Sequence, residues 1–309
     1  MRLAFFGTSA FAVPALESLH RNGHEVCLAV CPPPKPQGRG RRLVPSPVEN
    51  AARSMGLPVR NPVDPNSAEF AEELEALDTD ACVLAAYGYI LKPHLLRIPK
   101  HGFINLHPSL LPEYRGAAPI QRALLDGREE TGVSVIGITA KVDAGPVYAV
   151  EKVPIDPNET CGDLSVRLAD VGASLLATVL EGISEGRAEP SPQDRTEATS
   201  APKIGKDERE LHWTEPARAL HNRVRALSPE PAAWTSFRER RILVYRSGLR
   251  EGTGDAPAGA LVLDLPGIVV ATGSGLLELV EVKPESGKVQ PGTSLRNGLR
   301  PEPGERMGN

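Results

Sequence analysis

The chain has 309 residues, which is more than one ordinary domain needs and suits two. Its 40% hydrophobic and 24% charged residues are typical of a globular protein, its formal net charge is -4, and no apolar run reaches the length of a membrane span. Four scattered cysteines, without a Cys-x-x-Cys or His-x-x-His pair, argue against a disulfide framework and a zinc site. We therefore expect a cytoplasmic protein without a signal peptide, membrane segment or metal.

The chain begins with the pattern of a parallel β-α-β unit. Residues 2–7 form a short apolar run that ends in glycine, residues 11–19 have apolar side chains at helical spacing, and residues 24–30 indicate a second strand. No Gly-x-Gly-x-x-Gly motif follows the first strand, so dinucleotide binding is not supported.

Residues 32–47 are rich in proline and glycine and carry four cations and no acid. Such a segment cannot form a helix or an interior strand. One interpretation is a solvated basic loop. The other is a phosphate-contacting loop, because exposed arginine and lysine side chains neutralise a nucleic-acid backbone without reading its sequence.

Alternating helices and strands then continue the pattern of a mostly parallel sheet. We expect helices over residues 48–55 and 68–77 and a short strand over 57–59. Residues 80–88 form an apolar run that reads as a strand turning into a loop.

Residues 102–112 read Gly-Phe-Ile-Asn-Leu-His-Pro-Ser-Leu-Leu-Pro, a strand that must end where the prolines begin. Asn105 and His107 are two positions apart, so on a strand their side chains share one face, about 7 Å apart. Polar side chains at the carboxyl end of a strand are where open α/β sheets bind ligands. The alternative is a hydrogen-bonded histidine and an Asx turn without further function.

A third polar residue follows the next expected strand, residues 131–139. Asp143 precedes Gly145-Pro146, so a rigid turn places its carboxylate. Taken alone, an aspartate beside a glycine is usually a turn former. Together, Asn105, His107 and Asp143 form a set with clear roles: an amide that donates to a carbonyl oxygen, an imidazole that stabilises an oxyanion or moves a proton, and a carboxylate that favours the charged imidazole.

The remainder predicts two helices, a linker and a second, β-rich part. Residues 118–125 and 164–183 are helical, 146–155 alternates as a strand, and 186–202 has the composition of a linker. Beyond the linker, a helix over 217–227 precedes five short strands, which favour a small OB-like barrel. The strands are expected at 233–237, 241–246, 260–265, 268–272 and 276–282.

These motifs resemble those of the methionyl-tRNA formyltransferases, a branch of the formyltetrahydrofolate-dependent formyltransferase family. The core Asn-x-His-x-Ser-Leu-Leu-Pro at 105–112 recurs across that family, and Gly-Ala-Ala-Pro-Ile-Gln at 116–121 is similar to the initiator-tRNA branch. The chain departs from the family at Cys-Pro-Pro-Pro 31–34, where Thr-x-Pro-Asp is usual, and at Ile-Leu-Lys-Pro 90–93, where Ile-Leu-Pro is frequent.

The resemblance implies transfer of the formyl group of 10-formyltetrahydrofolate to the α-amino group of methionyl-initiator tRNA. It makes Asn105, His107 and Asp143 catalytic, with direct attack by the amine and no covalent intermediate. The folate-binding residues carried over from the family are Ser109, Leu110, Leu111, Pro112, Ala86, Tyr87, Gly88 and Ile90. Those expected to contact tRNA are Arg39, Arg41, Arg42 and Lys206.

The same resemblance implies an α/β chain with two domains. We expect a Rossmann-like, mostly parallel-sheet formyltransferase domain over 1–187, a linker over 188–205, and an OB-like β-barrel that binds tRNA over 206–309. The expected partners are initiator methionyl-tRNA and the folate donor, and a monomer is expected.

Other functions use the same core motif. Formyl transfer to an amino sugar nucleotide or a purine precursor stays open, although small acceptors need neither the basic loop nor the barrel. A hydrolase of formyltetrahydrofolate and a catalytically idle tRNA-binding protein are further alternatives. Activity with a folate donor distinguishes the idle protein from the enzymes.

Overall fold

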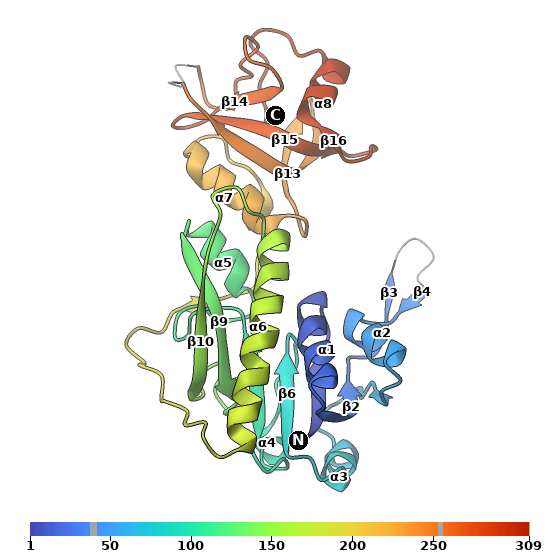
Figure 1. Ribbon diagram of the computed structural model, residues 1–309. Helices are drawn as coiled ribbons and strands as arrows, with labels where there is room; N and C mark the ends of the chain where they lie inside the picture. The colour runs from blue at the N-terminus through green and yellow to red at the C-terminus, as the bar shows by residue number, and fades with distance from the viewer. Residues whose placement is uncertain (38–41, 253–255, 309) are drawn as a thin grey trace. The chain divides into compact units, whose positions relative to one another are not determined.

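The structure, a computed structural model, describes residues 1–37, 42–252 and 256–308 (Figure 1). The chain forms two compact units. Unit 1 comprises residues 1–119, 130–154 and 165–202, and unit 2 comprises residues 120–129, 155–164 and 203–309. The units are therefore interleaved along the sequence, and the functional boundaries expected at 187/188 and 205/206 stay a prediction.

Unit 1 is built around a seven-stranded sheet with the order β10-β9-β7-β6-β1-β2-β5. Its neighbours from β5 to β7 pair in parallel, whereas β9 is antiparallel to both β7 and β10. The mostly parallel α/β sheet expected from the sequence is confirmed. The strands are β1 (Arg2–Gly7), β2 (Glu25–Val30), β5 (Val59–Arg60), β6 (Ala81–Ala85), β7 (Phe103–His107), β9 (Glu130–Gly137) and β10 (Val147–Pro154).

Helix α6 (Cys161–Ser184) runs along one face of this sheet in Figure 1. A Cβ atom added at Gly172 on this helix would lie 2.8 Å from Cδ2 of Leu106, so the helix approaches β7 too closely for a side chain there. Because alternate strand residues point to opposite faces, Asn105 and His107 point away from α6. The other helices of the unit are α1 (Val13–Arg21), α2 (Pro47–Ser54), α3 (Ala68–Ala76) and α4 (Pro93–Leu96).

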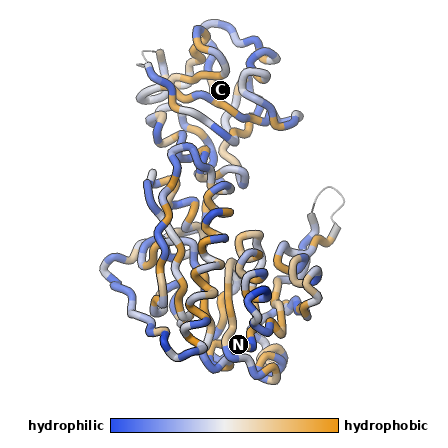
Figure 2. The backbone as a smooth tube through the Cα atoms, in the orientation of Figure 1, coloured by the Kyte–Doolittle hydropathy of each residue, from blue (hydrophilic) through white to orange (hydrophobic). Residues whose placement is uncertain are grey.

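A hydrophobic cluster against the central strands contains four aromatic side chains, those of Phe6, Phe70, Tyr87 and Phe103. The ring of Phe6 on β1 meets the rings of Tyr87 and Phe103 edge-on, at centroid distances of 5.4 and 5.2 Å. The central strands are accordingly hydrophobic in Figure 2, whereas the segment after α6 is largely hydrophilic.

Two short sheets lie apart from the main one. In the basic segment, β3 (Lys35–Gln37) pairs antiparallel with β4 (Arg42–Val44), so the segment forms a separate hairpin and no interior strand. After α6, β11 (Ser200–Ala201) pairs in parallel with β8 (Arg115–Gly116). The segment with a linker's composition is therefore tied by hydrogen bonds to the chain that follows β7.

Unit 2 contains an antiparallel five-stranded sheet, which agrees with the β-rich second part expected from the sequence. Its order is β12-β13-β15-β14, with β16 paired to β15. The helix expected at 217–227 is confirmed. The elements are α7 (Ala217–Leu227), β12 (Ala233–Phe237), β13 (Arg240–Arg250), β14 (Ile268–Ala271), β15 (Leu276–Pro284), β16 (Gln290–Pro291) and α8 (Gly292–Leu299).

The strand expected over residues 260–265 is wrong. Ala260 and Leu261 make only isolated bridges, to Arg306 and Val270. The guanidinium of Arg296 on α8 donates to the main-chain carbonyls of residues 263, 265 and 267, so a side chain from far along the sequence holds this segment.

Segments far apart in the sequence complete unit 2. Arg122 on α5 (Pro119–Leu125) pairs with Glu208, its Nη2 atom lying 3.0 Å from Oε2. The main-chain nitrogen of Gly162 donates to the carbonyl oxygen of Ser228 at 3.0 Å. Residues 120–129 and 155–164 thus belong to the same compact unit as the carboxyl-terminal part.

Candidate active site

Strand β7 brings Asn105 and His107 to one face at the carboxyl end of the parallel strands. It lies between β6 and β9, and Asn105 is in register with Leu84 and Ile136. Asn105 and His107 are both buried, with only 6% and 4% of each residue exposed. Buried polar groups need hydrogen-bond partners, and the partners of these two define the site.

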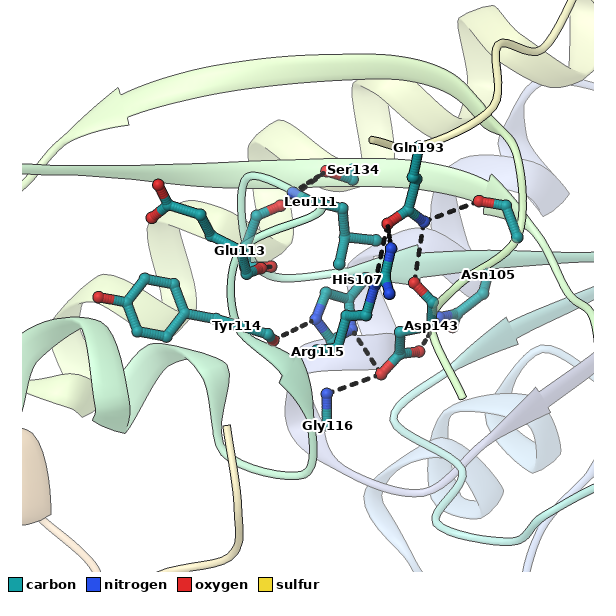
Figure 3. A network of polar contacts seen from close by, with 12 residues as sticks. Asn105, His107, Leu111, Glu113, Tyr114, Arg115, Gly116, Ser134, Asp143 and Gln193 are labelled. Carbon is teal, nitrogen blue, oxygen red and sulfur yellow. Dashed lines mark hydrogen bonds and ion pairs between the residues drawn. The ribbon is translucent and has the colours of Figure 1, made fainter. Parts of the chain in front are cut away.

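The imidazole of His107 is fixed on both sides. Nε2 lies 3.0 Å from the carbonyl oxygen of Tyr114, and a carbonyl only accepts, so Nε2 is the donor and carries a proton. The other ring nitrogen, Nδ1, lies 3.7 Å from Oδ2 of Asp143. Nδ1 is therefore the nitrogen that can gain or lose a proton, and it faces a carboxylate (Figure 3).

The carboxylate of Asp143 collects donors from three parts of unit 1. Oδ2 accepts a hydrogen bond of 2.9 Å from the main-chain nitrogen of Gly116 and faces His107, while Oδ1 lies 3.4 Å from Nδ2 of Asn105. Asp143 has a φ of +48°, in the left-handed region that residues with a side chain seldom adopt. The structure thus brings the three predicted catalytic residues together, with Asp143 held in an uncommon backbone conformation.

A cavity of about 120 Å³ opens beside this group. Asn105 and Asp143 line one part of it, and the rest is largely apolar. Ile90 and Val142 also line it and are 74% and 57% exposed, which is unusual for large aliphatic side chains. The remaining lining residues are Leu84, Tyr89, Leu91, Ile136, Ile138, Thr139, Ala140, Lys141 and Gly145. An apolar cavity with a few polar groups at one end is the usual form of a small-molecule site.

Of the predicted folate-binding residues in the loop after β6, Ile90 lines this cavity and the other three do not. Ala86 and Gly88 have φ values of +46° and +82°, so they set the path of the loop. Tyr87 is 2% exposed and packs into the core against Phe6.

The amide of Asn66 holds the same loop from outside the cavity. Its Nδ2 donates to the carbonyl oxygen of Ile90 at 3.0 Å, and its Oδ1 accepts from the main-chain nitrogen of Lys92 at 2.7 Å. Both halves of one amide therefore fix the loop segment that carries Ile90.

The predicted folate-binding residues Ser109, Leu110, Leu111 and Pro112 form the turn after β7 and do not line the cavity. The hydroxyl of Ser134 on β9 holds this turn, because it donates to the carbonyl oxygen of Ser109 at 2.7 Å and accepts from the nitrogen of Leu111 at 3.1 Å. The turn leads to Tyr114, whose carbonyl oxygen orients His107.

Residues 139–142 form one wall of the cavity and were not among the predicted site residues. Arg115 and Gln193 were not predicted either: Gln193 contacts the loop that carries Asp143, and Arg115 contacts Gln193. The wall could have been inferred from Val142, an apolar residue in the turn between two predicted strands. Gln193 has no local signal, since it lies in a polar segment without periodicity.

The structure describes only two of the four residues expected to contact tRNA. Arg39 and Arg41 lie outside the described residues. Arg42 belongs to β4, where its backbone is in register with Gln37. Lys206 is exposed and precedes the short 3-10 helix Asp207–Arg209 in unit 2.

Across residues 1–37, 42–252 and 256–308, no cluster of three or more His, Cys, Asp or Glu side chains could hold a metal ion. Within the same part of the chain, no helix is both long enough and apolar enough to cross a membrane. The four cysteines are free thiols.

Comparison with known proteins assigns both units to one kind of enzyme. Residues 1–180 match the model of the formyl transferase family, and residues 203–300 match that of the formyl transferase C-terminal domain. The methionyl-tRNA formyltransferases of Moorella thermoacetica and Thermus thermophilus are 42% and 45% identical to the chain over 309 residues, covering 100% of it and 99% of each relative. The enzyme of the same name from Streptomyces coelicolor is 41% identical over 310 residues, with both chains fully covered.

Solved structures have the same fold at lower identity. HypX from Aquifex aeolicus, in complex with tetrahydrofolic acid, superposes with a TM-score of 0.69 at 17% identity over 97% of this chain and 47% of that one. An N-formyltransferase from Helicobacter canadensis, in complex with folinic acid and dTDP-3-aminofucose, gives a TM-score of 0.68 at 19% identity over 89% and 97% of the two chains. With a family model matched across most of its length and full-length relatives above 40% identity, the chain belongs to the formyl transferase family.

Proposed function

We propose that this chain transfers the formyl group of 10-formyltetrahydrofolate to the α-amino group of methionyl-initiator tRNA. One observation carries the chemistry: Asn105 and Asp143 line the polar end of an apolar cavity, and the imidazole of His107 lies behind them against Asp143. The full-length relatives named methionyl-tRNA formyltransferase favour the acceptor. Because the reaction prepares tRNA for translation initiation, we place it in the cytoplasm, with the monomer as the acting form.

Asn105 is the donor for the formyl oxygen. Its side-chain amide lines the cavity, and Nδ2 is held 3.4 Å from Oδ1 of Asp143. As the amine attacks, negative charge develops on the formyl oxygen, and a donor already aimed at that point lowers the barrier without reorganising.

His107 and Asp143 handle charge and protons. Nε2 of His107 is occupied by the carbonyl of Tyr114, so the exchangeable proton resides on Nδ1, beside Asp143. In its charged form the imidazole stabilises the developing oxyanion, and the Asp143 carboxylate accepts the proton that the attacking amine loses, directly or through water. When the tetrahedral intermediate collapses, the bond between the formyl carbon and N10 of the donor breaks, and N10 takes up the proton as tetrahydrofolate leaves. No covalent intermediate is required, because no serine or cysteine nucleophile with a neighbouring base lies in the described cavity.

The apolar cavity suits the pterin end of the donor. Ile90 and Val142 present exposed aliphatic surface at the cavity, and a flat heteroaromatic ring between them would remove that surface from water. Ala86, Tyr87 and Gly88 support this binding by shaping the loop, and Ser109, Leu110, Leu111 and Pro112 support it by shaping the turn on the other side of β7.

In this proposal the basic segment, residues 32–47, and the carboxyl-terminal part of the chain bind the acceptor tRNA. Arg39, Arg41, Arg42 and Lys206 would contact phosphates and position the acceptor stem without reading its sequence. In this proposal residues 1–187 form the catalytic and donor-binding domain, and residues 206–309 the tRNA-binding domain.

A formylation assay tests the proposal. Purified protein is incubated with 10-formyltetrahydrofolate and either charged initiator tRNA or charged elongator methionine tRNA, and formyl-methionyl product is scored. Product on the initiator alone is expected, and Asn105→Ala serves as the inactive control. Release of tetrahydrofolate and formate without formylated tRNA would mean that the acceptor assignment is wrong. Formylation of an amino sugar nucleotide in its place would support the small-molecule alternative.

A further inference from the structure

We propose that Gln193 is a positioning residue for Asp143, and that the polar segment after α6 is therefore part of the catalytic apparatus. This inference rests on the proposed function, because it assigns Gln193 to the same reaction.

The segment reaches the site by pairing with β10. The main-chain nitrogen and carbonyl of Ser191 each form a hydrogen bond of 2.8 Å with Val147, the first residue of β10. Pro192 follows, and Gln193 then extends toward the loop between β9 and β10 (Figure 3). The backbone that carries Gln193 is thus anchored next to the loop that it contacts.

Both the nitrogen and the oxygen of the Gln193 side-chain amide have hydrogen-bond partners. Nε2 donates to the carbonyl oxygens of Asp143 and Gly145, at 2.9 and 2.7 Å. Oε1 accepts from Nε and Nη2 of Arg115, at 3.0 and 2.6 Å. Since carbonyls only accept and a guanidinium only donates, these partners determine which way the amide faces.

The two carbonyls held by Gln193 belong to a loop with a constrained backbone. Asp143 has its φ of +48°, and a Cβ atom added at Gly145 would overlap the carbonyl oxygen of Gly137. A residue with an unfavourable φ persists only where its surroundings hold it. Gln193 binds this backbone from one side, and the carboxylate on the other side reaches Gly116, Asn105 and His107.

Arg115 connects Gln193 to the strand that contacts the Asp143 carboxylate. It lies in β8, directly before Gly116, whose main-chain nitrogen donates to Asp143. Gln193 therefore ties together the strand that supplies a donor to the carboxylate and the loop that carries the carboxylate. A small displacement of a catalytic group lowers the reaction rate strongly. Because Gln193 fixes both β8 and the loop that carries Asp143, we expect its loss to lower kcat rather than the affinity for substrates.

The test compares Gln193→Ala and Gln193→Glu with the unaltered full chain, with Glu189→Gln as a matched control. The carboxylate introduced by Gln193→Glu would keep an acceptor for Arg115 but could not donate to the two carbonyls, so the two replacements separate the halves of the amide. Glu189 is an exposed residue of the same segment, and its replacement also changes the charge there by one. The measurements are kcat, the KM values of donor and tRNA, and the thermal unfolding midpoint.

We expect kcat to fall at least 10-fold in both Gln193 variants, with both KM values within about 3-fold and unfolding little changed. Normal kcat in Gln193→Glu would overturn the proposal, because contact with Arg115 would then be sufficient. A parallel loss of unfolding temperature, kcat and both affinities would indicate a merely structural role and would also overturn it.

Hydrogen exchange of the amides of residues 139–146 supplies a readout that does not require activity. Exchange of this loop should be faster in Gln193→Ala than in the unaltered protein or in Glu189→Gln. If the unaltered protein formylates no tRNA, the proposed function fails, and the exchange rates still decide whether Gln193 holds the loop. Unchanged exchange would refute that role.

Discussion

Nε2 of His107 donates a hydrogen bond of 3.0 Å to the main-chain carbonyl oxygen of Tyr114. The contact keeps one ring nitrogen protonated and leaves Nδ1 as the nitrogen that exchanges its proton beside Asp143. Tyr114 itself has a φ of +58°, so an uncommon backbone conformation supplies the carbonyl that orients the histidine.

Removing the side chain of Asn105 or of Asp143 should reduce the rate of formyl transfer strongly. Asn105→Ala and Asp143→Ala should each lower kcat by about 10²-fold or more, because the first deletes the donor to the developing oxyanion and the second deletes the acceptor of the amine proton. Single-turnover formylation measures the effect, and circular dichroism checks that the fold is retained. Asp170→Ala, at an exposed position on α6, is the matched control. A near-normal rate in either variant would remove that residue from the mechanism.

Asn66 should affect donor binding rather than chemistry. Asn66→Ala removes the hydrogen bonds to Ile90 and Lys92, and two such bonds correspond to about a 10-fold rise in the KM of the donor. Asn66→Asp retains the acceptor for the nitrogen of Lys92, so its donor KM should lie between that of the unaltered protein and that of Asn66→Ala. Steady-state kinetics with varied donor measures this, with Asn50→Ala on the exposed surface of α2 as control. An unchanged donor KM would show that the loop holds its position without Asn66.

The exposed aliphatic side chains of the cavity should contribute apolar contact to the donor. Ile90→Ala removes surface that a ligand would cover, and we expect the donor KM to rise about 10-fold with little change in the KM of tRNA. Val166→Ala provides the comparison, because Val166 is also exposed, at 65%, but lies on α6. Equal effects of the two substitutions would contradict donor binding at this cavity.

The cysteines should react slowly in the folded protein. Burial raises the pKa of Cys31 to about 11 and that of Cys161 to about 12, and it also raises the pKa values of Cys27 and Cys82. A raised pKa means less thiolate at a given pH, and the thiolate is the reactive form. Timed alkylation at pH 8 with mass spectrometry should label the half-buried Cys27 first and the other three only after unfolding. Cys27→Ser should abolish early labelling, and equally fast labelling of Cys82 in the native protein would contradict this order.

The arginines of the basic segment should set the salt dependence of tRNA binding. Replacing Arg39, Arg41 and Arg42 by alanine should weaken binding, and each lost phosphate contact should reduce the slope of log Kd against log salt by roughly 0.7–0.9. Filter binding at several salt concentrations gives this slope. Lys152→Ala is the control, because Lys152 is already paired with Glu130 at 3.0 Å. An unchanged slope in the triple variant would place tRNA contact elsewhere.

Local sequence patterns predicted the parts of the site that depend on one strand. The alternation of side chains placed Asn105 and His107 on one face, and the structure agrees because that geometry needs no partner strand. The approach of Asp143 depends on the pairing of β7 with β9, whose register the sequence does not reveal. The strand expected at 260–265 was wrong, and the segment is held instead by a residue far along the chain, Arg296, whose contacts the sequence does not reveal. Gln193 was not predicted because its amide donates to residues about fifty positions away, and its own segment contains no pattern that indicates these contacts.

The interleaving of the two units has a consequence for the order in which a nascent chain can fold. The last segment of unit 1 is complete once Pro202 has been synthesised. Residues 120–129 and 155–164 have been made by then, but their partners, among them Glu208 and Ser228, have not. During synthesis, therefore, these two segments stay without their native packing until their partners in unit 2 have left the ribosome, even though every residue of unit 1 has already been made.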